Sequence, residues 1–415
     1  MIGQVERMRL KPILVFVLLL IVTPLLSGCW DRLEIEERAV ILGIAIDSVD
    51  SGSDKMSEVT HLKTTFPTPE NRMVEITVQI AVPGRIPLGP GEGGGGGGGG
   101  NRKPVWVLSA VGHTIDDAMM VLQQKLADRI FLGHLRMIVI SEEIAKEGTG
   151  NLNDYLRRNP EVRRLAWMIV SKGKASKLIH AAPQLERVPA LYLLAMMDHA
   201  VEMGKYPNEF VGVFWSKESS KGREANLPYV ESKKNGSVEI SGMAFFKGDK
   251  MVGKTKPLEI GLYMAVTNVK RGGYAALIRF PGTDNYIMFS ATHRLAKTRI
   301  AIKNGRPHVA IHIILEGNIE EKSDEHVNKV STDHSLRALE NQIENQGEKA
   351  CMKLLKSTQK KGSDIFGFGE LTRAKESRYW KREIRSKDTW ERIYKDIAID
   401  VRYTVNIRRV GMKAR

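Results

Sequence analysis

The sequence predicts a mixed α/β (α+β) fold with several domains, in which an N-terminal α/β module precedes an antiparallel sheet packed on a long helix. Three observations predict it. Strand and helix patterns alternate between residues 104 and 181, as in α/β modules with at least partly parallel strands. A helical pattern runs from Ser331 to about Gln359, and apolar residues alternate with small or polar ones over 397–407.

The N-terminal module is predicted to span residues 29–205. The apolar run Ala39 to Ile46 indicates a buried strand, and Met73 to Val82 continues with an alternating pattern. Thr114 with Asp117 makes an N-capping pair, so a helix should follow the strand that ends near residue 111.

A glycine-rich tract interrupts this module at residues 91–100. A phosphate-binding loop would need a Gly-Lys-Ser/Thr ending and a helix start, whereas Asn101, Arg102 and Lys103 follow the tract. The composition therefore predicts a mobile loop.

Residues 206–236 are predicted to be a linker, because the chain turns polar between Lys217 and Asn235. The C-terminal α+β domain is then 237–415. Its strongest hairpin signal is Asn304-Gly305, since Asn-Gly suits the tight turn of a two-residue hairpin. The long helix and the alternating strand follow this hairpin.

The first 28 residues predict a signal peptide of the bacterial lipoprotein type. Three basic residues precede an apolar run from Ile13 to Leu26, which ends in Leu26-Ser27-Gly28-Cys29. The run has 14 residues, fewer than the roughly 20 that a membrane-spanning helix needs. We therefore expect cleavage before Cys29 and a diacylglyceryl anchor on its sulfur, which places the protein outside the cytoplasm on a membrane.

The net charge of the chain is +15, and its basic excess is concentrated near the end. Residues 371–415 hold 14 Lys and Arg against 6 Asp and Glu. No base-reading module accompanies these charges, so the sequence predicts no nucleic-acid partner. Two interpretations stay open: a solvated basic face, or attraction to an anionic membrane surface.

No linear motif supports catalysis, a metal or a cofactor. The sequence lacks a Gly-x-Ser-x-Gly elbow, a His-Glu-x-x-His motif, a Cys-x-x-Cys pair and a dinucleotide fingerprint. His308 and His312 share one face of a predicted strand, but no third ligand is placed beside them. Cys351, the other cysteine, lies in a helical pattern and is predicted to be a buried structural thiol. We expect no enzyme activity.

Ordered landmarks along the chain resemble the Ger(x)C family of spore-germination lipoproteins, the C subunits of germinant receptors. The matching residues are Gly28-Cys29-Trp30-Asp31-Arg32 with Glu34-Ile35, Gly43 to Asp47, Gly112-His113-Thr114, Gly133-His134-Leu135, Asp154 with Arg157-Arg158, Ser241 to Lys247 with Met251-Val252-Gly253, Asp364 to Gly369, and Trp390. Each piece is short, but together they cover the chain from Cys29 onward in the same order.

The resemblance implies a non-enzymatic subunit on the outer leaflet of the spore inner membrane. There it would act with the A and B subunits of the receptor to sense nutrients. It also implies three domains, so the N-terminal half would divide into two subdomains. The family supplies no catalytic residues, and Cys29 is the residue carried over. Neither the nutrient nor direct contact with it follows from the resemblance.

A lipid-anchored solute-binding protein of a transporter is the alternative, since it shares the export signal and the α/β character. Such a protein should bind an amino acid or a sugar by itself, which calorimetry and a raised melting temperature would reveal.

Overall fold

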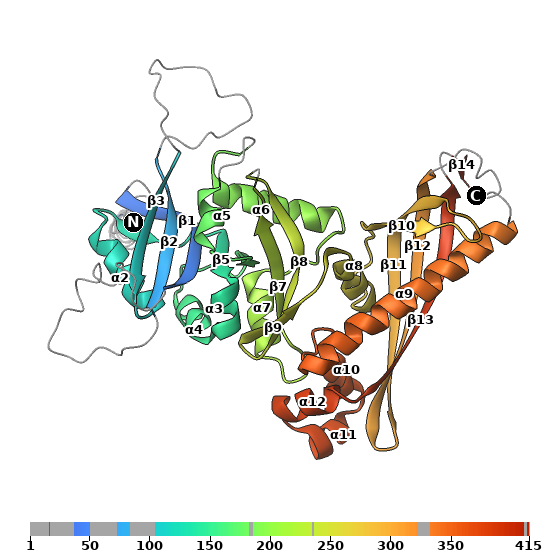
Figure 1. Ribbon diagram of the computed structural model, residues 1–415. Helices are drawn as coiled ribbons and strands as arrows, with labels where there is room; N and C mark the ends of the chain where they lie inside the picture. The colour runs from blue at the N-terminus through green and yellow to red at the C-terminus, as the bar shows by residue number, and fades with distance from the viewer. Residues whose placement is uncertain are drawn as a thin grey trace, which may run out of the picture.

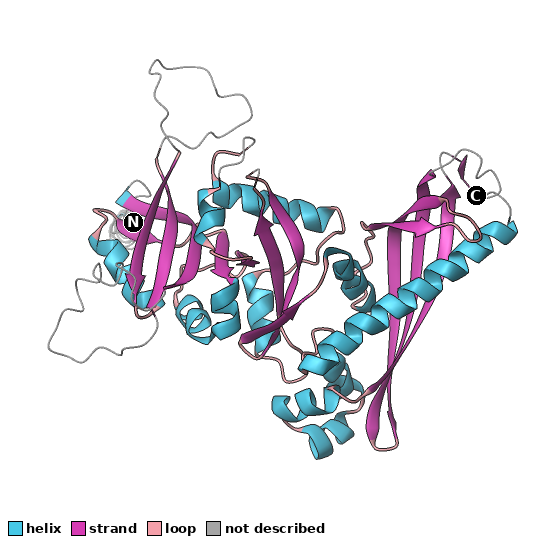
Figure 2. Cartoon of the chain, viewed as in Figure 1, coloured by secondary structure: helices cyan, strands magenta, loops and turns pink. Residues whose placement is uncertain are grey.

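The computed structural model describes residue 16 and residues 37–49, 73–83, 104–181, 186–234, 236–322, 333–410 and 413–414. In these residues the strands form two sheets, one of nine strands and one of five, which we call the first and the second sheet. The two sheets occupy opposite ends of an elongated molecule (Figure 1). The mixed α and β class predicted from the sequence is confirmed (Figure 2).

The first sheet has a parallel centre and antiparallel flanks, in the order β3-β2-β1-β5-β6-β7-β8-β9, and β4 pairs with β1. Its strands are β1 Arg38–Val49, β2 Met73–Ala81, β3 Val105–Gly112, β4 Arg129–Phe131, β5 Met137–Ser141, β6 Trp167–Ser171, β7 Asn226–Ser232, β8 Val238–Lys247 and β9 Lys250–Lys254. The pairs β1/β5, β5/β6 and β6/β7 are parallel. The central strands are buried on both faces, which explains their continuous apolar runs.

Helices cover this sheet, and α2 starts at the cap that the sequence predicts. They are α2 Ile115–Gln124, α3 Glu142–Glu147, α4 Gly150–Arg158, α5 Ser176–His180, α6 Pro189–Glu202 and α7 Val211–Glu218. Thr114 accepts a hydrogen bond from Asp117 N at 3.2 Å, and His113 N donates to Asp117 Oδ2 at 2.7 Å. This reciprocal pair starts α2 where the sequence predicted a helix.

The segment 206–236 differs from the predicted linker in its local structure. It contains α7 and β7, and β7 pairs with β6 and β8 inside the first sheet. The first sheet then continues to Lys254 at the end of β9, while the second sheet begins at Ala275. Three charged residues of this segment are buried in ion pairs: Glu209 with Lys217, and Glu224 with the distant Lys387.

The second sheet is a hairpin extended by a parallel strand, in the order β10-β11-β12-β13-β14. Its strands are β10 Ala275–Arg279, β11 Tyr286–Lys303, β12 Arg306–Lys322, β13 Ala398–Val410 and β14 Lys413–Ala414. Asn304 and Gly305 both have positive φ, 49° and 70°, as the predicted tight turn requires. The sheet is not wholly antiparallel, because β12 and β13 run in parallel.

Helix α9 Asp333–Lys361 crosses one face of the second sheet (Figure 1). It packs on β13, where Tyr403, Val405 and Ile407 are buried. The remaining helices of this half are α8 Pro257–Val266, α10 Phe368–Lys375, α11 Ser377–Tyr379, a π-helical turn Trp380–Ile384 and α12 Lys387–Tyr394. In the part of the chain described here, no helix is long and apolar enough to cross a membrane.

Candidate functional site: a buried polar junction

Segments from both halves of the chain meet in a buried polar contact, which we call the junction. It comprises Glu209, Lys217, residues 222–226, Tyr263, residues 363–369, Lys387 and Trp390. Main-chain hydrogen bonds join the segments directly: Glu224 N donates to Asp364 O at 2.8 Å, and Glu370 N donates to Gly222 O at 3.0 Å. The segments therefore pack backbone against backbone.

Asp364 lies at the centre of the junction with 1% of its surface exposed. Its Oδ1 accepts from Gly367 N at 2.9 Å, and its Oδ2 accepts from Gly369 N at 2.8 Å and from Trp390 Nε1 at 2.9 Å. Burial raises the pKa of Asp364 to about 6, against the lowering effect of these N–H donors. Above that pH the junction encloses a carboxylate held by main-chain and indole donors.

A buried ion pair links α7 to the loop before it. The side chains of Lys217 and Glu209 are 5% and 6% exposed and form an ion pair. Lys217 Nζ also donates to Asn226 Oδ1 at 2.8 Å, and Tyr263 OH donates to the same oxygen at 3.2 Å. Removing one partner of such a pair costs about 3–5 kcal/mol, because the other charge stays buried.

Arg223 connects this pair to the Asp364 segment. Its Nε donates to Ile365 O at 3.2 Å, and its Nη2 donates to Tyr263 OH at 3.1 Å. A single guanidinium thus bridges α8, the loop after α7 and the segment before α10.

Glu224 is the third buried ionisable group of the junction. Its side chain is 2% exposed, its Oε2 lies 3.0 Å from Lys387 Nζ, and Gly248 N donates to the same oxygen at 2.9 Å. Burial raises the pKa of Glu224 to about 8; Lys387 opposes the rise, and the neighbouring carboxyl of Glu391 adds to it. At neutral pH this carboxyl therefore tends to keep its proton.

Beside the junction lies an open polar hollow of about 510 Å³. Its charged lining is Lys217, Lys221, Arg223, Arg373 and Glu370. Glu370 is already bound by Arg373 at 2.5 Å and by Ser220 Oγ at 2.5 Å. The hollow therefore presents net positive charge, while the side chains of the junction itself bond to one another and to the main chain.

The structure places the histidines that sequence reasoning singled out beside one polar side chain each. Among the described residues, no group of three or more His, Cys, Asp or Glu side chains could hold a metal ion. His308 Nε2 lies 2.9 Å from Asp400 Oδ2, and His312 Nε2 lies 2.9 Å from Thr404 Oγ1. Cys29 and the glycine tract lie outside the described residues.

Cys351 is fully buried in α9, as predicted. Burial raises the pKa of its thiol to about 12, so the reactive thiolate is scarce at neutral pH.

Several landmarks of the family resemblance converge on the junction. Asp364 to Gly369 and Trp390 form its centre, and Ser363 Oγ donates to Phe246 O at 2.5 Å, which brings in the 241–247 landmark. Other landmarks lie elsewhere: Asp47, at the end of one, accepts from Ala175 N at 2.6 Å and so joins β1 to α5.

Sequence reasoning missed five charged residues of the junction: Glu209, Lys217, Arg223, Glu224 and Lys387. No local spacing indicates that they meet. Lys217 bonds to Glu209 and Asn226, eight and nine residues away, whereas the partners of Arg223 and Glu224 are distant in sequence.

Comparison with known proteins decides the family. Residues 31–232 match the family described as "Spore germination protein N-terminal domain", and residues 241–411 match "Spore germination B3/GerAC like, C-terminal". The chain belongs to the Ger(x)C family of spore germination proteins. The resemblance stated from the landmark residues is confirmed.

Curated relatives in this family cover most of the chain. Spore germination protein KC of Bacillus subtilis (strain 168) is 26% identical over 424 residues, which cover 96% of this chain and 96% of the relative. Spore germination protein GerQC of Bacillus cereus is 26% identical over 308 residues, or 74% of this chain and 83% of the relative. These matches support a role in spore germination.

A solved structure shares the fold. The crystal structure of the GerBC protein superposes with a TM-score of 0.55 at 16% identity, and the match covers 81% of this chain and 93% of that one. At this identity the likeness concerns the fold alone. It supports an N-terminal α/β part followed by a sheet packed with a helix.

Proposed function

We propose that the chain is a lipid-anchored, non-enzymatic subunit of a nutrient germinant receptor, held on the outer leaflet of the spore inner membrane. One observation carries this proposal. The two family matches occur in order, and the first begins at Asp31, two residues after the cysteine of the predicted lipoprotein signal. The matched regions thus follow directly on the proposed anchor.

The anchor is a diacylglyceryl group on Cys29. Two acyl chains hold a protein stably on a bilayer, whereas one chain binds reversibly. On that surface the chain acts with the A and B subunits of the receptor.

The contacts of the junction support a structural role. Asp364, Lys217 and Glu224 each bond to main-chain groups or to a buried partner. Catalytic acids and bases instead need a side chain within reach of a substrate. The proposed role is therefore to hold a defined shape at the membrane and to transmit contacts between subunits.

Deletion and a point substitution in spores test the proposal. Spores without the chain should form normally and fail to germinate on nutrient, and Cys29→Ala should incorporate no labelled fatty acid. Cys351→Ala is the matched control, since it leaves the anchor in place and should retain both label and response. A normal nutrient response in the deletion strain, with no paralogue substituting, would falsify the receptor role.

Calorimetry separates this proposal from the solute-binding alternative. The purified full chain should show no binding heat with amino acids or sugars that trigger germination. Saturable heat with a raised melting temperature would instead favour a solute-binding protein.

A further inference from the structure

One face of the second sheet carries no helix in the described part of the chain. Helices α8 and α9 lie on the other face, where they line an apolar groove together with Tyr403. Side chains alternate along β13, so Asp400 and Arg402 are exposed while Tyr403 and Val405 are buried under α9. We call the uncovered side, which bears Asp400 and Arg402, the outer face.

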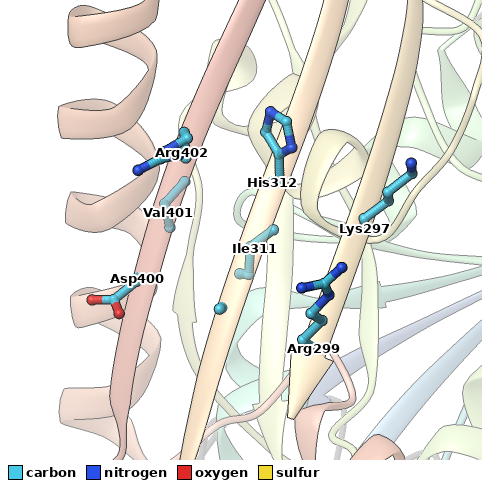
Figure 3. Close-up of a pocket in the computed structure, with 8 residues that line it drawn as sticks. Lys297, Arg299, Ile311, His312, Asp400, Val401 and Arg402 are labelled. Carbon is cyan, nitrogen blue, oxygen red and sulfur yellow. The ribbon is translucent and has the colours of Figure 1, made fainter.

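Basic side chains form a row across the centre of the outer face. Lys297 of β11 pairs in register with His312 of β12, and His312 pairs with Arg402 of β13. Neighbouring strands lie about 4.8 Å apart, so the row spans on the order of 10 Å. Arg299 follows Lys297 two residues along the same strand and on the same face (Figure 3).

Two acids on this face contact basic side chains. Glu316 lies 2.5 Å from Arg408, and Asp400, which lines the same centre of the face, lies 2.9 Å from His308. Within the described ranges, Lys297, Arg299 and Arg402 form no ion pair. These three side chains leave positive charge on the outer face, which an anion from outside the chain would balance.

The centre of the face is hollowed. Ala310 pairs with Arg299 on one side and with Asp400 on the other, and its short side chain leaves space between them. The resulting open depression is about 470 Å³, and its lining includes the row and Arg299. A shallow, open site of this kind fits headgroups presented on an extended surface better than one enclosed solute.

We propose that the outer face of the second sheet rests on the headgroups of an anionic phospholipid bilayer, with Lys297, Arg299 and Arg402 on the phosphates. The inference extends the proposed function, because the bilayer is the one that holds the Cys29 anchor. The polypeptide that follows Cys29 enters the first sheet, at the opposite end of the molecule from this face (Figure 1). Contact at both ends would fix the orientation of the chain on the membrane.

Each basic side chain near an anionic membrane contributes about 1 kcal/mol, which corresponds to roughly a fivefold change in the docking equilibrium. Neutralising three of them should therefore weaken docking about a hundredfold. Screening at high salt should weaken it in the same direction.

Photocrosslinking in nanodiscs tests the inference with the full lipidated chain. Discs contain phosphatidylcholine alone, or phosphatidylcholine with one third phosphatidylglycerol, plus a trace of photoactivatable lipid of either kind. We expect photoactivatable phosphatidylglycerol to label β11–β13 at least fivefold more than photoactivatable phosphatidylcholine does. The triple variant Lys297→Gln, Arg299→Gln, Arg402→Gln should lose this preference, and so should the wild type in 0.5 M salt.

The matched control is Lys349→Gln, Lys353→Gln, Lys356→Gln. These residues are exposed on α9, which covers the opposite face of the same sheet, and the control removes the same charge. It should label like the wild type. Equal labelling by the two lipids, unchanged labelling in the first triple variant, or capture of an acidic protein in place of lipid overturns the inference.

The same samples separate this inference from the proposed function. The outer-face variant keeps Cys29, so it should still carry labelled fatty acid. If it does, and the wild type shows no preference for phosphatidylglycerol, the inference fails and the anchored receptor subunit stands. Absence of fatty acid on Cys29 would count against the anchor whatever the crosslinking shows.

Discussion

Substituting Gly369 with Ala should destabilise the junction. A Cβ at this position would lie 2.4 Å from Trp390 Nε1 and 2.6 Å from Gly222 Cα. Neither neighbour can move freely, since Trp390 donates to buried Asp364 and Gly222 O accepts from Glu370 N. Ordinary carbon contacts begin near 3.5 Å, so one side must shift by about 1 Å.

The cost follows from those contacts. Overpacking a filled core costs about 1–3 kcal/mol, and loss of the Trp390 bond to the Asp364 carboxylate adds about 1.5–3 kcal/mol. We expect Gly369→Ala to lower the free energy of unfolding by about 3–5 kcal/mol. Urea denaturation at pH 7.5 measures this, with tryptophan emission as a probe because Trp380 and Trp390 pack near the junction, their ring centroids 5.7 Å apart.

Gly150→Ala is the matched control. This glycine lies at the start of α4, and the nearest atom to an added Cβ is Asp249 Oδ2 at 3.3 Å, the end of a flexible side chain. Both glycines lie in the first turn of a helix, so any gain from the higher helix propensity of alanine is shared, and the control should be neutral or slightly stabilising. A change below about 0.5 kcal/mol in Gly369→Ala, or an equal loss in both variants, would refute the steric argument.

Three further predictions concern buried groups. Burial raises the pKa of Glu224 to about 8, against 4.5 for the free carboxyl, so the folded state keeps a proton that the unfolded state releases. The free energy of unfolding should therefore fall as the pH rises from 5 to 8. Glu224→Gln should flatten this fall, as measured by denaturation at several pH values. Arg294 donates to four main-chain carbonyls, so Arg294→Met should cost about 3 kcal/mol in urea denaturation, and a loss below 1 kcal/mol contradicts this. Cys351 should react with a thiol reagent only after unfolding; immediate reaction of the native chain would show an accessible thiol.

Local patterns predicted local structure well. The turn at Asn304-Gly305, the cap at Thr114 and the alternation along β13 all depend on residues within a few positions of one another, and each is confirmed. Helix α9 likewise follows its apolar spacing to within two residues at either end. In each of these cases, residues within one short segment determine both its backbone conformation and which of its faces is buried.

Pairing between distant segments could not be predicted in the same way. The sequence predicts an antiparallel sheet, but strand β13 lies parallel to β12. The alternation along β13 specifies which face is buried and does not specify the direction of the strand. The polar composition after Lys217 predicts a linker. Glu224 in this stretch is nevertheless buried against Lys387 and Asp364, which no nearby residue indicates.

The junction also limits how the first sheet can move against the segment that follows α9. Gly222, Arg223 and Glu224 lead into β7 of the first sheet, and Asp364 and Trp390 belong to the segment after α9. Their bonds are buried and include main-chain pairs, so separating the two would expose buried charge and unpaired main-chain groups. A displacement of the first sheet should therefore carry the second sheet with it. We propose an anchor at one end of the molecule and contact of the outer face with lipid at the other. A partner subunit that tilts either end must then break a membrane contact or strain the junction. The contact of the outer face with lipid is weaker than the anchor, so it should break first.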